Sequence, residues 1–116
     1  MKLNHVTIQC RNLEKSVSFY REIVGLDIVG EINAGPRHIY FLANGEGETA
    51  VELIGNPEAA YQGSGISLGF GCSDVESYRE ELAAKGYEPT PIISPNPKTK
   101  FFFIADPDGV QVQFIN

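Results

Sequence analysis

Alternating apolar and polar positions predict β-strands at both ends of each half of the chain. In residues 5–10, Val6, Ile8 and Cys10 alternate with polar side chains, and residues 67–72 repeat the alternation. Because successive side chains of a strand point to opposite faces, each predicted strand has one apolar face. The apolar faces are expected to pack on helices. The opposite faces gather side chains that can coordinate, donate or accept: His5, Glu52, Ser67 and Gln113.

Two interpretations of these polar faces stay open from the alternation alone. In the first, the faces are simply solvated, as in many antiparallel sheets that are covered on one side. In the second, the sheet is concave and its inner face lines a pocket. Gly69 and Gly71 favour the second interpretation, because they remove side chains where a ligand could enter.

Apolar residues recur at helical spacing in two segments. The first predicted helix has Asn12 as its N-cap and ends at Gly25, which can adopt a left-handed conformation. In the second helix the spacing of Ser73 and Glu76 predicts a capping box, and Gly86 ends the helix. The expected buried stripes are Leu13, Val17, Tyr20, Ile23 and Val24 in the first helix, and Val75, Tyr78, Leu82 and Ala83 in the second.

The two halves of the chain show matching features in the same order, which predicts an internal duplication. Residues 5–14 align with residues 67–76 without a gap, and both copies have a cysteine at the same place. Each half is expected to form a strand, a helix and three more strands. The predicted organisation is a single domain over residues 1–116, with module one at about 1–55, a linker at about 56–65 and module two at about 66–116.

Composition restricts the class of protein. The chain has 116 residues, 42% hydrophobic and 21% charged, which is typical of an ordinary globular domain. Its formal charge of −6 argues against binding to nucleic acid or to anionic membranes, which need clustered cations. No apolar run reaches the roughly 20 residues of a membrane span. The N-terminus lacks the apolar stretch of a signal peptide, so a cytoplasmic protein with unpaired Cys10 and Cys72 is expected.

Four motifs resemble those of one protein family: residues 3–8, 12–20, 51–53 and 106–114. The last motif begins with a predicted tight turn, which Asp106 and Asp108 are expected to stabilise. With these motifs the chain resembles the vicinal oxygen chelate superfamily, which includes glyoxalase I, bleomycin-resistance proteins and extradiol dioxygenases. The resemblance implies an α+β fold of two βαββ modules that form a curled mixed sheet around a central cavity, with helices on the outer face. It also implies a small-molecule ligand and a homodimer.

Metal-dependent members of this family hold a divalent cation, such as Ni, Zn, Mn or Fe, on the inner sheet faces. The matching positions in this chain are His5, Glu52, Ser67 and Gln113. His5 and Glu52 agree with the family pattern, whereas Ser67 and Gln113 replace the usual His and Glu. A hydroxyl is a poor ligand for borderline cations, and an amide cannot act as a base at neutral pH. The missing second histidine argues against an extradiol dioxygenase.

The resemblance therefore implies two candidate functions. The first is a glyoxalase-like lyase or isomerase for a small oxygen-rich compound, with a cation on His5, Glu52 and Gln113 and with Glu52 as the catalytic residue that moves a proton. The second is a non-catalytic protein of the bleomycin-resistance type, which binds an antibiotic or aromatic molecule without a metal cofactor. The expected contacts to the bound molecule come from Thr7, His38, Ser67 and Gln113. In the second candidate, the hydrogen-bonding wall residues are His5, Glu52, Ser67 and Gln113.

Overall fold

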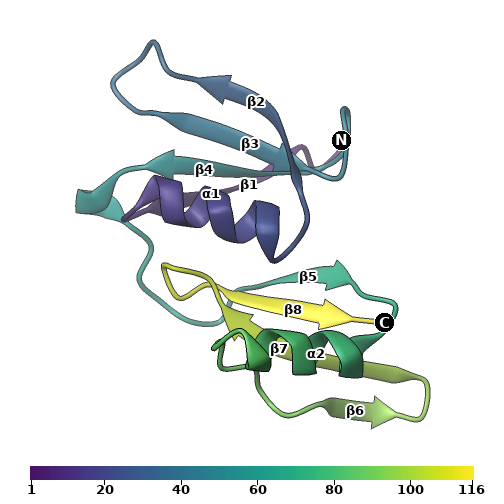
Figure 1. The fold of residues 1–116 in the computed structure, drawn as a ribbon. Coiled ribbons are helices and arrows are strands. Elements are labelled where there is room, and N and C mark those ends of the chain that lie inside the picture. The colour runs from purple at the N-terminus through teal and green to yellow at the C-terminus, as the bar shows by residue number, and fades with distance from the viewer. The chain divides into compact units, whose positions relative to one another are not determined.

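Each half of the chain folds as the repeat predicts, into one strand, one helix and three further strands. The computed structural model describes residues 1–116 (Figure 1). The first half contains β1 (His5–Cys10), α1 (Leu13–Glu22), β2 (Asp27–Ile32), β3 (Ile39–Ala43) and β4 (Ala50–Gly55), followed by the short 3₁₀ helix η1 (Pro57–Ala59). The second half contains β5 (Ser67–Gly71), α2 (Val75–Ala84), β6 (Ile93–Asn96), β7 (Thr99–Ala105) and β8 (Gln111–Ile115).

The strands form two four-stranded mixed sheets with the same topology. The first sheet has the strand order β1-β4-β3-β2, and the second has the order β5-β8-β7-β6. In each sheet the first and last strands of the half pair in parallel, and the other pairs are antiparallel. The predicted α+β class and its two repeated modules are confirmed, with one sheet in each module. The central cavity and the module boundaries near residues 55 and 66 stay predictions.

The chain forms two compact units. The first comprises residues 1–63 and 107–109, and the second comprises residues 64–106 and 110–116. The turn between β7 and β8 therefore belongs to the first unit, although the two strands that it joins belong to the second. In each unit the helix packs on one face of its sheet, which leaves the other face for the polar side chains of the strands (Figure 1).

The buried face of α1 differs from the predicted stripe. Tyr20 and Ile23 are buried as predicted. The residues of the stripe that are only partly buried are Leu13, Val17 and Val24. Ser16 and Phe19 are buried instead, because the Ser16 hydroxyl donates to Asp108 and the Phe19 ring packs edge-on against Tyr20, with 5.1 Å between centroids. A polar residue in a buried position breaks the hydrophobic period from which the stripe was predicted.

The second helix is capped by Asp74, so the predicted capping box with Ser73 is wrong. The Asp74 side chain accepts a hydrogen bond from the backbone N–H of Ser77 at 3.0 Å. The helix begins at Val75, one residue later than the box requires, and this makes Asp74 the N-cap. The fully buried part of the predicted stripe is limited to Val75 and Leu82.

Replacing Asp74 with alanine is expected to lower the free energy of unfolding by about 1 kcal/mol, because it removes the cap of α2. Urea denaturation followed by circular dichroism measures this loss. The matched control is Ser73→Ala, which removes a hydroxyl from the neighbouring exposed residue and is expected to change the stability very little. Equal losses in the two variants would contradict the cap at Asp74.

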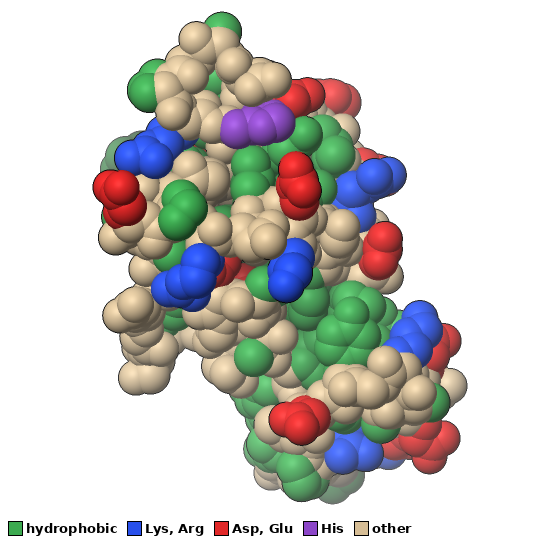
Figure 2. Space-filling model, turned by 60° about the vertical axis from the view of Figure 1, so that its left-hand side comes forward, with side chains coloured by type: hydrophobic (Ala, Val, Ile, Leu, Met, Phe, Trp, Pro, Cys, Tyr) green, Lys and Arg blue, Asp and Glu red, His purple; other side chains and the backbone are tan.

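Both cysteines are free thiols. Cys10 is buried, whereas Cys72 is partly buried, and this burial raises the pKa of the Cys72 thiol. Neither helix has the length and the apolar composition needed to cross a membrane. On the face drawn in Figure 2, acidic and basic side chains are interspersed.

Candidate functional site

One face of the first sheet carries His5, Thr7 and Glu52, and α1 covers the other face. Thr7 of β1 lies opposite Glu52 of β4, and Phe41 of β3 lies opposite Glu52 on its other side. The next residue of β4, Leu53, is fully buried on the helix side. The structure thus brings three of the predicted site residues together. Phe41 was missed because alternation along β3 does not tell which of its faces lies beside Glu52, and the pairing of β3 with β4 decides this.

The carboxylate of Glu52 is the centre of this group. Its Oε1 atom lies 3.5 Å from His5 Nε2 and also accepts a hydrogen bond from the Thr7 hydroxyl. The Glu52 side chain is 13% exposed, whereas that of His5 is 45% exposed. The His5 ring meets Phe41 edge-on, with 5.9 Å between the ring centroids. The largely buried carboxylate of Glu52 therefore contacts the more accessible imidazole of His5. The contacts from His5 and Thr7 both go to Oε1, which leaves Oε2 for a ligand.

The second sheet repeats this row of residues with different chemistry. Gly69, Gln113 and Phe103 lie opposite one another on β5, β8 and β7, in the same register as the row around Glu52. A Cβ at position 69 would lie 3.0 Å from Gln113 Oε1. Because glycine has no Cβ, the Gln113 amide has space there. Phe103 meets Phe101 edge-on at 5.6 Å. The row therefore offers an amide and aromatic rings where the first sheet offers a carboxylate.

Ser67 begins β5 as His5 begins β1, and it lies opposite Gln111 of β8. Ser67 and Gln113 belong to the second unit, whereas His5 and Glu52 belong to the first. The structure therefore places each pair on one sheet face. The convergence of all four side chains on one cavity stays a prediction.

The donors on the first sheet suit a divalent cation. Two ligands about 2.1 Å from a tetrahedral zinc lie roughly 3.4 Å apart, and His5 Nε2 and Glu52 Oε1 are 3.5 Å apart. An imidazole nitrogen and a carboxylate oxygen are donors that zinc, nickel and iron accept. No group of three or more His, Cys, Asp or Glu side chains is arranged to hold a metal ion. The family resemblance predicts Gln113, with a neutral amide oxygen, as a third donor, and this stays a prediction.

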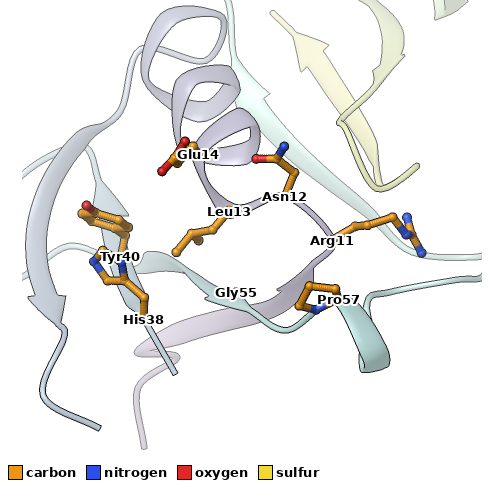
Figure 3. Close-up of a pocket in the computed structure, with 8 residues that line it drawn as sticks. All are labelled: Arg11, Asn12, Leu13, Glu14, His38, Tyr40, Gly55 and Pro57. Carbon is orange, nitrogen blue, oxygen red and sulfur yellow. The ribbon is translucent and has the colours of Figure 1, made fainter. Parts of the chain in front are cut away.

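His38 lies apart from this group, on the helix side of the first sheet. It is followed on that side by Tyr40, whose partner on β4 is the buried Leu53, and its Nε2 lies 2.6 Å from Glu31 Oε2. The His38 and Tyr40 rings are 4.6 Å apart between centroids. Together with the start of α1 they line a cavity of about 400 Å³ (Figure 3). The structure does not bring His38 to the face of His5.

Asp108 has contacts that turn chemistry does not predict. Asp106 does stabilise the turn, since it accepts a hydrogen bond from the Val110 backbone N–H at 2.9 Å. Asp108, with a side chain only 1% exposed, accepts from the backbone N–H of Arg11 at 2.9 Å, from its guanidinium at 3.4 Å and from the Ser16 hydroxyl at 3.3 Å. These bonds fix the junction between β1 and α1. No local motif indicates them, because Arg11 lies 97 residues away in the sequence.

Known proteins are similar to this chain in sequence and in fold. A lactoylglutathione lyase of Haemophilus influenzae is 26% identical, covering 99% of this chain and 92% of the relative. A probable lactoylglutathione lyase of Synechocystis sp. is 30% identical, covering 99% of this chain and 95% of the relative. The fold is similar to that of an antibiotic binding protein from Streptomyces, with a TM-score of 0.77 and 19% identity over 98% of this chain and 93% of that one. A family model matches residues 2–114, and the chain therefore belongs to the Glyoxalase/Bleomycin resistance protein/Dioxygenase superfamily.

Proposed function

We propose that this chain is a glyoxalase-type lyase or isomerase that acts on a small compound with two neighbouring oxygens. The observation that carries the proposal is the distance of 3.5 Å between His5 Nε2 and Glu52 Oε1, with the Thr7 hydroxyl on the same carboxylate oxygen. Two relatives named lactoylglutathione lyase and probable lactoylglutathione lyase, at 26% and 30% identity over nearly the whole chain, support this reaction class.

In this proposal His5, Glu52 and Gln113 hold a divalent cation, such as nickel, zinc, manganese or iron. The cation, when bound, supplies Lewis-acid polarisation of the two ligand oxygens. Glu52 takes a proton from the hydroxyl-bearing carbon next to the ligand carbonyl and returns it to the former carbonyl carbon. The hydroxyl proton passes to the former carbonyl oxygen, so the hydroxyl and the carbonyl change places. Thr7 fixes Oε1 of this carboxylate beside His5, so Oε2 is left to move the proton. Ser67 and Gln113 hydrogen-bond to the remaining polar groups of the ligand.

A second candidate is a metal-free protein that binds an antibiotic or another aromatic molecule. Neutral Ser67 and Gln113 at two of the family's ligand positions favour it, because neither supplies a charged ligand. The edge-on rings of Phe101 and Phe103 also favour it, since aromatic ligands pack well on such rings. In this candidate the imidazole and carboxylate of the first sheet are hydrogen-bonding groups. The homodimer implied by the family resemblance and the expected cytoplasmic location belong to both candidates.

Replacing His5 with alanine is expected to weaken nickel or zinc binding at least about tenfold, because it removes the only nitrogen ligand of the proposed site. Calorimetric titration with Ni²⁺, Zn²⁺, Mn²⁺ and Fe²⁺ in turn, with elemental analysis of the purified protein, measures this change. The matched control is His38→Ala, which removes the chain's other histidine from the opposite side of the same sheet. This control is expected to leave the affinity for the cation unchanged.

Two outcomes would overturn the metal-dependent reading. Equal losses in His5→Ala and His38→Ala would show that the cation does not depend on the Glu52 face. A protein that binds none of the four cations, and that binds aromatic ligands equally well with and without His5, would favour the metal-free binding protein.

A further inference from the structure

The cavity beside α1 lies on the opposite side of the first sheet from the proposed reaction site. Its volume is about 400 Å³, within the range of small-molecule sites. The walls come from the start of α1, the residues around the start of β3 and the end of β4 with η1: Leu13, Glu14, His38, Tyr40, Gly55 and Pro57. Because all of these residues belong to the first unit, the cavity is complete within that unit.

Two aromatic rings form one wall of this cavity. The His38 and Tyr40 rings are 4.6 Å apart and inclined by 37°, and Glu31 fixes the imidazole through a contact of 2.6 Å to Nε2. Leu13 points between this pair and Gly55 at the opposite wall (Figure 3). A Cβ at position 55 would lie 3.3 Å from Leu13 Cβ, so the glycine allows Leu13 its place on the floor. The wall and floor together suit a flat or apolar body.

The charge at the aromatic end of the cavity is negative. The Glu14 carboxylate lies on the side of the cavity where Tyr40 stands (Figure 3). Partial burial raises the pKa of Tyr40, and the charges of Glu31 and Glu14 raise it further, so both carboxylates act at this phenol. The one cation of the rim, Arg11, extends away from the rings in Figure 3 and contacts Asp108 at 3.4 Å. The field inside the cavity therefore favours a positive group.

We propose that this cavity binds an organic cation, an amine attached to an apolar or aromatic body. The ammonium group lies beside the Glu14 carboxylate and over the faces of His38 and Tyr40, where the ring electrons and the carboxylate both attract it. The apolar body covers Leu13 and Gly55. The formal charge of −6 on the chain adds a longer-range attraction for cations. This site does not depend on the reaction proposed for His5 and Glu52.

Benzylamine is the probe for this site, with benzyl alcohol as its neutral counterpart and benzoate as its anionic one. In a titration of the ¹⁵N-labelled full chain followed by NMR, benzylamine is expected to give saturable shifts at Leu13, Glu14 and Gly55. Benzyl alcohol and benzoate are expected to bind at least about threefold more weakly, because they lack the attraction to the carboxylate and the rings. Equal binding of the three probes would overturn the proposal.

Replacing Glu14 with glutamine is expected to weaken the binding of benzylamine about three- to fivefold and to leave the affinity for benzyl alcohol unchanged. The control is Glu22→Gln, which makes the same substitution at the other end of α1, also at an exposed residue. Equal weakening by both variants would mean that only net charge matters and would overturn the site.

The variant His5→Ala tests whether this cavity is separate from the proposed reaction site. Benzylamine is expected to bind this variant as it binds the unchanged chain. Shifts confined to the strands around Glu52 would place the amine there and overturn the inference.

Discussion

Replacing Asp108 with alanine is expected to lower the free energy of unfolding by about 3 kcal/mol. The substitution leaves the buried Ser16 hydroxyl and the backbone N–H of Arg11 without their acceptor. A buried donor such as the Ser16 hydroxyl costs about 1–3 kcal/mol when it loses its partner, and the partly buried N–H of Arg11 adds a smaller loss. The guanidinium of Arg11 adds little, because half of that side chain is exposed to water. The loss therefore comes mainly from the two orphaned donors.

Urea unfolding measures this loss, with Asp27→Ala as the control at an exposed aspartate. Asp108→Asn is expected to lose less than Asp108→Ala, because the amide oxygen still accepts from Arg11. In a Ser16→Ala background the Asp108→Ala substitution is expected to cost less, since one of the orphaned donors is absent. A loss no larger than that of Asp27→Ala would show that these bonds do not stabilise the fold.

Replacing Glu52 with glutamine is expected to slow proton transfer about 10²- to 10⁴-fold. The amide keeps an oxygen for the Thr7 hydroxyl but cannot take a proton at neutral pH. The second sheet already has this residue at the equivalent position, since Gln113 occupies the register place of Glu52. Hydroxyacetone is a suitable test compound because it has two neighbouring oxygens. Exchange of its carbon-bound hydrogens for deuterium, followed by NMR at saturating Ni²⁺, measures the rate.

The control for this experiment is Glu48→Gln, which changes an exposed glutamate in the loop before β4. It is expected to leave the exchange rate unchanged. Gln113→Glu is the complementary variant, and it is expected to tighten cation binding because it adds a charged ligand to the proposed set. Exchange that continues at the same rate in Glu52→Gln would contradict Glu52 as the base.

Much of the fold was predictable because short-range patterns determine it. The two-residue alternation of apolar and polar positions assigned the faces of β1 and β5, and the internal repeat predicted the order of elements in both halves. The same alternation grouped His5 and Thr7 on one side of β1. Once β1 and β4 pair in register, strand geometry places the Glu52 side chain on that side as well.

The sequence-based predictions were wrong where the burial of a residue depends on a partner far away in the sequence. They were also wrong where the start of a helix differs by one position. Ser16 is buried because Asp108 accepts its hydrogen bond, so its polarity concealed the true buried face of α1. The cap of α2 moved from Ser73 to Asp74 because both residues are good caps and the helix start decides between them. Alternation correctly placed His38 on the same side of the strand as Tyr40. No pattern in the sequence tells which side of that strand faces a ligand.

The turn at residues 107–109 limits the ways in which the molecule can be divided. A fragment that stops at Gly63 keeps Arg11 and Ser16 but lacks the carboxylate that both of them bind. Chimaeras that exchange halves between relatives, and split-protein reporters cut in the linker, therefore need a first half that brings this turn with it. Crossover points that keep these bonds must take residues 1–63 and residues 107–109 from the same parent protein.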